Sequence, residues 1–274
     1  MKKLGEFIVT VILLPALYFF ISAIGGIVFM FGYALANNEK SSHIVVDSLQ
    51  EVVNRNISLI LLVVNTIMLV VLFIFCIPTK ASLLKRCNFK KCSIKKVLYT
   101  SLLVVGVAML TAVFVGLATN IFFSYKNVSN TIESSTTTVF QFFIVIVLAP
   151  IFEEIFFRGV IFYWLKNNFN IVFAIIVQAL VFAIMHGNIL QGIYTFFLGI
   201  ILALINMYTG SLYGNIAGHC VFNLFGTLII PSFLAKINFV AYIIIALALI
   251  CVSIFAVVRL RKLETISVNV GMYI

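Results

Sequence analysis

Charged side chains are scarce in this chain. Of its 274 residues, only 9% are Asp, Glu, Lys or Arg, whereas 64% are hydrophobic. A soluble domain needs a more polar surface, and several apolar runs here exceed the ~18 residues that indicate a transmembrane helix. The composition excludes a water-soluble protein and predicts an all-α, polytopic membrane protein.

Acidic residues are the rarest charges, eight in all against 18 Lys and Arg. The resulting net charge of +10 does not indicate a nucleic-acid partner, because the cations gather at the ends of the apolar runs. Thirteen of the 18 fall on one side of the predicted spans and four on the other. The positive-inside rule then predicts a multi-pass protein of the cell membrane, surrounded by the lipid bilayer, with both termini cytoplasmic.

Several catalytic signatures are missing. Asp47 is the only aspartate and lies in a predicted loop, which excludes a catalytic pair of aspartates. The chain also lacks a His-Glu-x-x-His zinc signature and a Gly-x-Ser-Gly nucleophile turn. Cys87 and Cys92 are spaced more widely than a usual zinc-ligand pair, and no second pair exists, so we expect reduced, structural cysteines.

The apolar runs predict about eight transmembrane helices in a single membrane domain, 1–274. Within it we expect a core, 138–230, to carry the residues that matter for function. An even number of spans keeps the C-terminal basic cluster on the same side as the other cations. The predicted spans are 6–36, 57–79, 98–125, 138–165, 171–187, 189–208, 214–230 and 239–259.

Three charges interrupt the fourth span. Glu153, Glu154 and Arg158 lie in a run that is otherwise almost wholly apolar, where each charge costs roughly 2.5–3.5 kcal/mol. Arg158 stands one helical turn after Glu154 and can neutralise it. Glu153 lies about 100° further round the helix, without an obvious local partner. Pro150 removes a backbone hydrogen bond nearby and can make room for water. An ion pair that only fixes packing would explain Glu154 and Arg158 but not Glu153.

Two of the three histidines lie in predicted spans. His186 ends the apolar run 171–185, and His219 shares a helix face with Asn223, four residues later. His43 lies in a predicted outer loop. One intramembrane histidine is as consistent with a helix-packing hydrogen bond as with a site. Helix rise allows the two histidines to reach the depth of Glu153, although His219 fits this least well.

These residue types can hydrolyse a peptide bond. A carboxylate beside a histidine can deprotonate water, and an asparagine amide with a histidine N–H can stabilise the oxyanion. One Glu and two His with an open position also suit zinc. The residues therefore allow a zinc-dependent mechanism or one that needs no cofactor.

The constellation resembles the CPBP family, which includes the CAAX proteases and bacteriocin-processing enzymes and is also called the abortive-infection family. The family's Glu-Glu-x-x-x-Arg motif matches 153–158, its Phe-x-x-x-His motif matches 182–186, and its His-x-x-x-Asn motif matches 219–223. Each motif is short, but the three occur in the family's order on the expected spans. The short loops and compact size are similar to those of bacterial members.

The resemblance implies an eight-helix intramembrane endopeptidase that cleaves a membrane-associated peptide or protein, in the processing of bacteriocins, signalling peptides or immunity-related peptides. It implies that Glu153 and His186 activate water, while His219 and Asn223 form the oxyanion pocket. The expected catalytic set is Glu153, Glu154, His186, His219 and Asn223, with Arg158 in support and with Glu153, His186 and His219 as ligands if a metal binds.

Two other classes of function fit the same residues. One is a non-catalytic immunity or scaffold protein of the same fold that binds a peptide or partner. The other is a proton-coupled transporter that uses Glu153 and His186 as a relay. The sequence disfavours the transporter, because it lacks the repeat symmetry that many transporters show.

Overall fold

The computed structural model describes residues 2–36, 44–79, 81–234 and 236–271, and these contain helices and short connections without any strand. The segments labelled η are π-helical. In chain order the elements are α1 (Lys2–Phe7), η1 (Ile8–Leu13), α2 (Leu14–Ala36), α3 (Ile44–Cys76), α4 (Leu83–Cys87), α5 (Ile94–Ala118), α6 (Tyr125–Ser134), α7 (Val139–Phe143), η2 (Ile144–Leu148), α8 (Ala149–Glu154), η3 (Ile155–Phe162), α9 (Tyr163–Asn168), α10 (Ile171–Ile184), α11 (Ile189–Thr209), α12 (Leu212–Leu224), η4 (Phe225–Ile229), α13 (Ile230–Leu234) and α14 (Phe239–Gly271).

Seven of the eight predicted spans are long and apolar enough to cross a membrane, so the chain is a multi-pass membrane protein. The fifth, predicted over 171–187, is the exception. It is the 14-residue helix α10, which is about 21 Å long and shorter than a bilayer's ~30 Å hydrocarbon core. The seven spans cover Lys2–Ala36, Leu49–Cys76, Ile94–Ala118, Val139–Asn168, Ile189–Thr209, Leu212–Phe233 and Val240–Leu263.

Local signals explain why α10 is short. The Asn170 side chain accepts a hydrogen bond of 2.9 Å from the backbone N–H of Phe173 and so caps the helix start. Gly187 follows the helix end with φ +67°, a conformation that glycine adopts without strain. His186 therefore lies in the turn after α10 and not within a long span.

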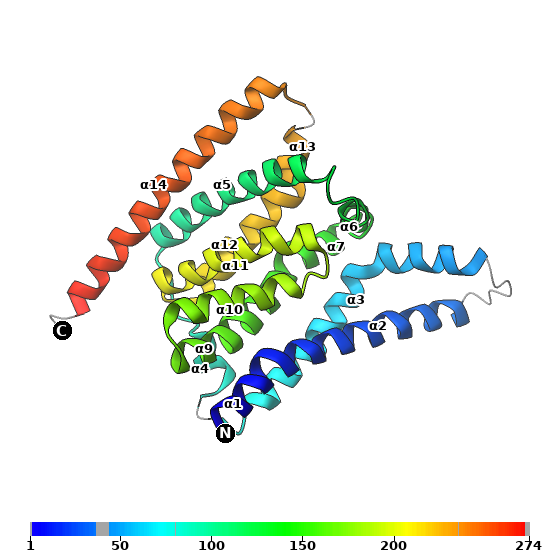
Figure 1. Ribbon diagram of the computed structural model, residues 1–274, viewed down its shortest axis with the longest axis horizontal. Coiled ribbons are helices and arrows are strands. Elements are labelled where there is room, and N and C mark those ends of the chain that lie inside the picture. Colours follow the sequence, from blue (N-terminus) through cyan, green and yellow to red (C-terminus); the bar gives the residue numbers. More distant parts are fainter. Residues whose placement is uncertain (1, 37–43, 80, 235, 272–274) are drawn as a thin grey trace.

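Both ends of the described chain lie at the same end of the helices in Figure 1, together with α4 and α9. Side-chain hydrogen bonds join the elements there. Lys3 Nζ donates to the backbone oxygen of Asn168, and Lys96 Nζ donates to that of Tyr208 at 2.9 Å. Arg261 Nε donates to the Tyr208 hydroxyl at 3.3 Å. The loop between α3 and α5 and the two terminal segments thus share one face of the molecule.

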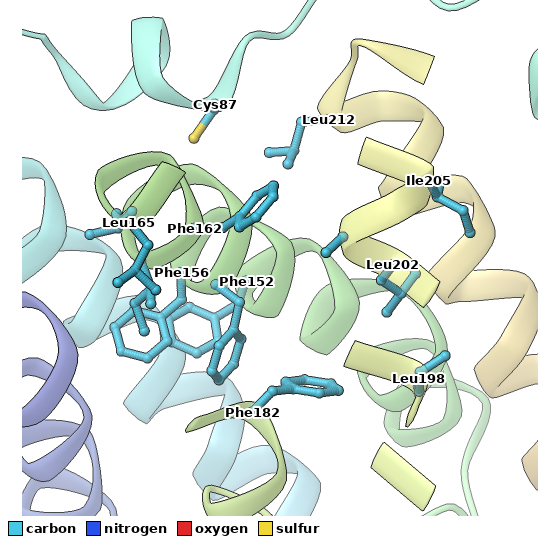
Figure 2. Close-up of a cluster of buried hydrophobic side chains, with 14 of the residues drawn as sticks. Cys87, Phe152, Phe156, Phe162, Leu165, Phe182, Leu198, Leu202, Ile205 and Leu212 are labelled. Atoms are coloured by element: carbon cyan, nitrogen blue, oxygen red, sulfur yellow. The ribbon is translucent and has the colours of Figure 1, made fainter. Parts of the chain in front are cut away.

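The helices pack around a core of large apolar side chains. Helix α5 packs against α14 and α12, α10 packs against α11, and α2 pairs with α3 (Figure 1). Figure 2 shows that aromatic rings from the fourth span fill the space between α4 and the α10–α12 helices. The site residues lie on these same helices, so the core fixes their relative positions. The residues labelled in this cluster are Cys87, Phe152, Phe156, Phe162, Leu165, Phe182, Leu198, Leu202, Ile205 and Leu212.

Candidate active site

The fourth span carries both glutamates on a helix that contains two π-helical segments. It is α-helical over α8, where Glu153 and Glu154 lie, and π-helical just before and just after, in η2 and η3. π-Helical turns are rare and occur often at functional sites. The sequence predicted a helix here with a proline disturbance, and the structure resolves that disturbance into a π-helical segment in a continuous helix.

Glu154 and Arg158 form the ion pair that their spacing predicts. Arg158 Nη1 donates to Glu154 Oε1 at 2.9 Å, and both side chains are completely buried. Arg158 Nη2 also donates to the backbone oxygen of Gly199 at 3.2 Å, and its guanidinium lies 5.1 Å from the centre of the Phe182 ring. A buried pair of this kind needs such additional partners, because both charges have lost their water.

Helix α12 supplies two further donors to Glu154. His219 Nδ1 lies 2.8 Å from Glu154 Oε1, and Asn215 Nδ2 lies 2.7 Å from Glu154 Oε2. Asn215 Nδ2 also donates to the backbone oxygen of Leu202 at 2.9 Å, which ties α12 to α11. Both carboxylate oxygens of Glu154 are therefore held, and His219 Nδ1 is the nitrogen that carries a proton when it donates to this carboxylate.

Glu153 obtains its partner from the same distant helix. Its Oε2 lies 3.5 Å from His219 Nε2, so the imidazole stands between the two glutamates. The Glu153 side chain is 25% exposed, in contrast to the fully buried Glu154. Glu153 is thus the partly exposed carboxylate of the pair, and Glu154 the buried one.

His186 approaches this group from the end of α10. Its Nδ1 lies 2.8 Å from the backbone oxygen of Phe182, which can only accept, so Nδ1 carries the proton and Nε2 keeps a lone pair. The Phe182 ring packs edge-on against both histidines, with ring centres 4.8 Å from His186 and 6.0 Å from His219. The phenylalanine of the second motif therefore positions both imidazoles.

Asn223 meets a carbonyl that the π-helix leaves free. In η2 the Ala149 N–H bonds five residues back, to Ile144 O. The next bond in this register would run from residue 150 to Val145 O, but Pro150 has no N–H. Asn223 Nδ2 donates to that oxygen instead, at 3.1 Å. One amide hydrogen of Asn223 remains for another acceptor.

A metal was one expectation for Glu153, His186 and His219. Both histidines have Nδ1 engaged and present Nε2, an orientation that suits metal ligation. However, within the described ranges no three His, Cys, Asp or Glu side chains are grouped so that they could hold a metal ion. The arrangement thus orients the two imidazoles without forming a three-ligand site.

Sequence reasoning missed two buried amides. Asn215 lies one helical turn before His219, and this spacing on the His219 face was the signal that could have found it. Gln178 Nε2, in α10, donates to the backbone oxygen of Gly199 at 2.9 Å and so shares that acceptor with Arg158. An added Cβ at Gly199 would lie 3.0 Å from Ala179 Cα and Cβ, so a glycine allows α10 and α11 to approach this closely.

In a comparison with known protein families, residues 135–225 match the family described as "Type II CAAX prenyl endopeptidase Rce1-like". No curated protein and no solved structure matches the chain. The matched segment begins just before α7 and ends at the start of η4, so it contains Glu153, Glu154, His186 and His219. Members of this family act on a protein or peptide in the membrane. Residues 135–225, which place a buried Glu154–His219 pair beside Glu153 in a multi-pass helical protein, are therefore similar to the Rce1-like domain of type II CAAX prenyl endopeptidases, a family of intramembrane proteases.

Proposed function

We propose that the chain hydrolyses a peptide bond inside the membrane with Glu153 as the general base that activates water. The observation that carries this proposal is the difference between the two adjacent glutamates. Glu154 is completely buried and fully hydrogen-bonded, whereas Glu153 is 25% exposed and faces His219 Nε2. Glu153 is placed to meet water, and Glu154 positions His219 without touching the substrate.

Charge balance supports a protonated His219. The cluster holds two carboxylates, Glu153 and Glu154, and one guanidinium, Arg158. With an imidazolium between the glutamates the four groups sum to zero, which low-dielectric surroundings favour over a net charge. His219 then carries its second proton on Nε2, on the side of Glu153, and acts as a donor.

The two histidines consequently take opposite roles. His186 donates Nδ1–H to Phe182 O and keeps its Nε2 lone pair, so it assists Glu153 in accepting the proton of water. His219 Nε2–H and the second amide hydrogen of Asn223 stabilise the oxyanion. These roles agree with those that the resemblance implied.

The reaction then balances as follows. Water gives one proton to Glu153 while its oxygen forms a bond to the carbonyl carbon. The oxyanion accepts hydrogen bonds from His219 and Asn223. When the intermediate collapses, the C–N bond breaks and the leaving amine takes a proton from His219, whose proton is restored from Glu153.

The substrate is a membrane-associated peptide or protein. The similarity of the compact chain to bacterial members favours the processing of bacteriocins, signalling peptides or immunity-related peptides over that of prenylated proteins. Both termini face the cytoplasm of the cell membrane in this proposal, because 13 of the 18 cations gather on the side where the termini lie.

The test compares wild-type protein, Glu153→Gln and Glu133→Gln on a quenched peptide library in detergent, each with and without a chelator. Glu133 lies exposed on α6 and provides the same substitution away from the site. We expect Glu153→Gln to lower kcat about 100-fold or more, as loss of a general base does, and Glu133→Gln to leave it unchanged. Unchanged cleavage by Glu153→Gln would overturn the proposal. Loss of wild-type activity in chelator would assign a metal to the site.

The alternative, a non-catalytic immunity or scaffold protein, predicts a different result. Its protective or binding activity would survive Glu153→Gln, because the substitution keeps the shape of the side chain and removes only the base. A protection assay with this variant in cells therefore separates the two functions.

A further inference from the structure

A groove lies away from the glutamates, between α5, α14 and the junction of α12 with η4. It has a volume of about 720 Å³, a basic end and an otherwise largely apolar lining. None of the glutamates or histidines of the candidate active site lines it. Its lining residues are Lys95, Leu98, Tyr99, Ser101, Leu102, Val105, Val221, Phe225, Arg259, Lys262 and Leu263.

The apolar wall runs along one face of α5. Lys95, Leu98, Leu102 and Val105 recur at intervals of three or four residues, which places them on the same side of the helix. From Lys95 to Val105 the helix rises about 15 Å. This is about half of the ~30 Å hydrocarbon core, so the wall has the depth of one leaflet.

The basic end holds three cations, of which Arg259 also lies over the Phe255 ring, 5.0 Å from its centre. Lys95, Arg259 and Lys262 come from the first turn of α5 and from α14, and they take part in none of the ion pairs among the described residues. Their neighbours Lys96 and Arg261 are engaged, because Lys96 Nζ donates to Tyr208 O and Arg261 Nε donates to the Tyr208 hydroxyl.

We propose that this groove binds an anionic phospholipid, with its headgroup phosphate held by Lys95, Arg259 and Lys262 and an acyl chain along the apolar face of α5. Three cations that form no ion pair with any other described residue, beside an apolar wall of one leaflet's depth, complement an anionic lipid better than a zwitterionic one. Basic pockets between transmembrane helices recognise anionic lipid headgroups in the same way. The lipid would join α14 to α5 and to the α12–η4 junction.

The groove lies against α12, the helix that carries His219, on the face opposite to this histidine. Val221 lies two residues from His219, about 200° round α12, so the groove and the candidate active site use opposite faces of one helix. A lipid in the groove therefore supports α12 without occupying the site where a peptide would be cleaved.

The test measures binding of fluorescent phosphatidylglycerol, and of phosphatidylcholine with the same chains, to the purified full chain in neutral detergent. The groove variant is the triple substitution Lys95→Gln, Arg259→Gln and Lys262→Gln. Its control, Lys85→Gln with Lys90→Gln and Lys91→Gln, removes the same charge from exposed residues that do not line the groove. We expect wild type to bind phosphatidylglycerol at least tenfold more tightly than phosphatidylcholine.

Because each cation contributes roughly fivefold to binding an anionic headgroup, the groove variant should lose about 100-fold in affinity for phosphatidylglycerol. The control should lose no more than about threefold, since its three lysines do not line the groove and water and salt screen exposed charges. Leu102→Trp should weaken the binding of the lipid by filling the apolar wall while all three cations remain.

Four results would overturn the proposal. They are no binding of phosphatidylglycerol by wild type, equal binding of both lipids, equal losses in the groove and control variants, and full competition by glycerol phosphate alone. The last result would assign the basic end to a soluble phosphate compound. Circular dichroism and thermal unfolding of both triple variants verify that they remain folded.

Discussion

Two Glu–Arg pairs with the same helical spacing stand in opposite surroundings. Glu51 and Arg55 on α3 are 2.6 Å apart with side chains 63% and 64% exposed, and Glu154 and Arg158 are 2.9 Å apart and wholly buried. Water screens the first pair, so its contribution to stability is small. The second pair is shielded from water, so each charge is stabilised mainly by the other.

This contrast predicts how the two arginines respond to removal. Arg158→Met leaves Glu154 buried without its cation and should lower the free energy of unfolding by about 3–5 kcal/mol. Arg55→Met, the matched control, should lower it by about 0.5 kcal/mol or less. Denaturant unfolding in mixed detergent micelles measures both. Equal losses in the two variants would contradict a buried pair.

Two cysteines outside the spans differ in how burial affects their chemistry. Burial raises the pKa of the Cys87 thiol from 9.0 to about 12, and it also raises that of Cys92, which is less buried. Only the thiolate reacts with alkylating agents, so at pH 8 about one in ten thousand Cys87 side chains is reactive. The protonated thiol is the form that the fold favours, so stability from this group is present below pH 9 and is lost between pH 9 and about pH 12.

We therefore expect iodoacetamide to label Cys92 well before Cys87 at pH 8, and the rate at Cys87 to keep rising up to about pH 12. Site-resolved mass spectrometry of the alkylated peptides measures both rates. Cys92→Ser should remove the faster of the two signals, and Cys87→Ser should leave it intact. Faster labelling of Cys87 in the folded protein would contradict its burial against η3.

The fourth span shows how one proline organises a helix and its neighbour. Pro150 cannot donate to Val145 O in the π-helical register of η2, and the Asn223 amide takes that place from α12. The asparagine is therefore held by a defect in the facing helix. The orientation of the Asn223 amide therefore depends on the proline in the facing helix as well as on α12.

A double-mutant cycle tests this dependence. Asn223→Ala alone should cost about 1–2 kcal/mol of unfolding free energy, because it leaves the part-buried Val145 carbonyl unpaired. In a Pro150→Ala background the backbone N–H of residue 150 can bond that carbonyl, so the same substitution should cost about 1 kcal/mol less. Thermal or denaturant unfolding of the four proteins gives the coupling. Additive losses would show that the carbonyl does not depend on Asn223.

Interactions within one helix were predictable from the sequence, and interactions between helices were not. The Glu154–Arg158 pair follows from helical spacing alone and is confirmed. The contact of His219 with both glutamates depends on how α12 packs against α8, about which spacing along the chain says nothing. The sequence analysis also missed the π-helical turns and the shortness of α10. Both depend on local backbone conformation, which a uniformly apolar sequence does not reveal.

The cationic end of the molecule predicts its orientation in the membrane. The described termini and the α3–α5 loop share one end of the helices (Figure 1), and most of the lysines and arginines lie there. Epitope tags added to either terminus should both be protected from protease in intact cells and both be cleaved after the membrane is opened. Tags found on opposite sides would mean an odd number of membrane crossings, in which α10 does not span the bilayer.

The 14 residues of α10 fall about 9 Å short of a typical hydrocarbon core. A helix too short for its bilayer draws the lipid surface inward, because neither the helix ends nor the polar turn beyond them tolerate hydrocarbon. His186 lies in that turn, so thinning of the bilayer around α10 would occur beside this histidine. Hydrophobic mismatch at this single helix would bring the aqueous phase toward Glu153, and a reaction that consumes water could proceed at membrane depth without a dedicated channel.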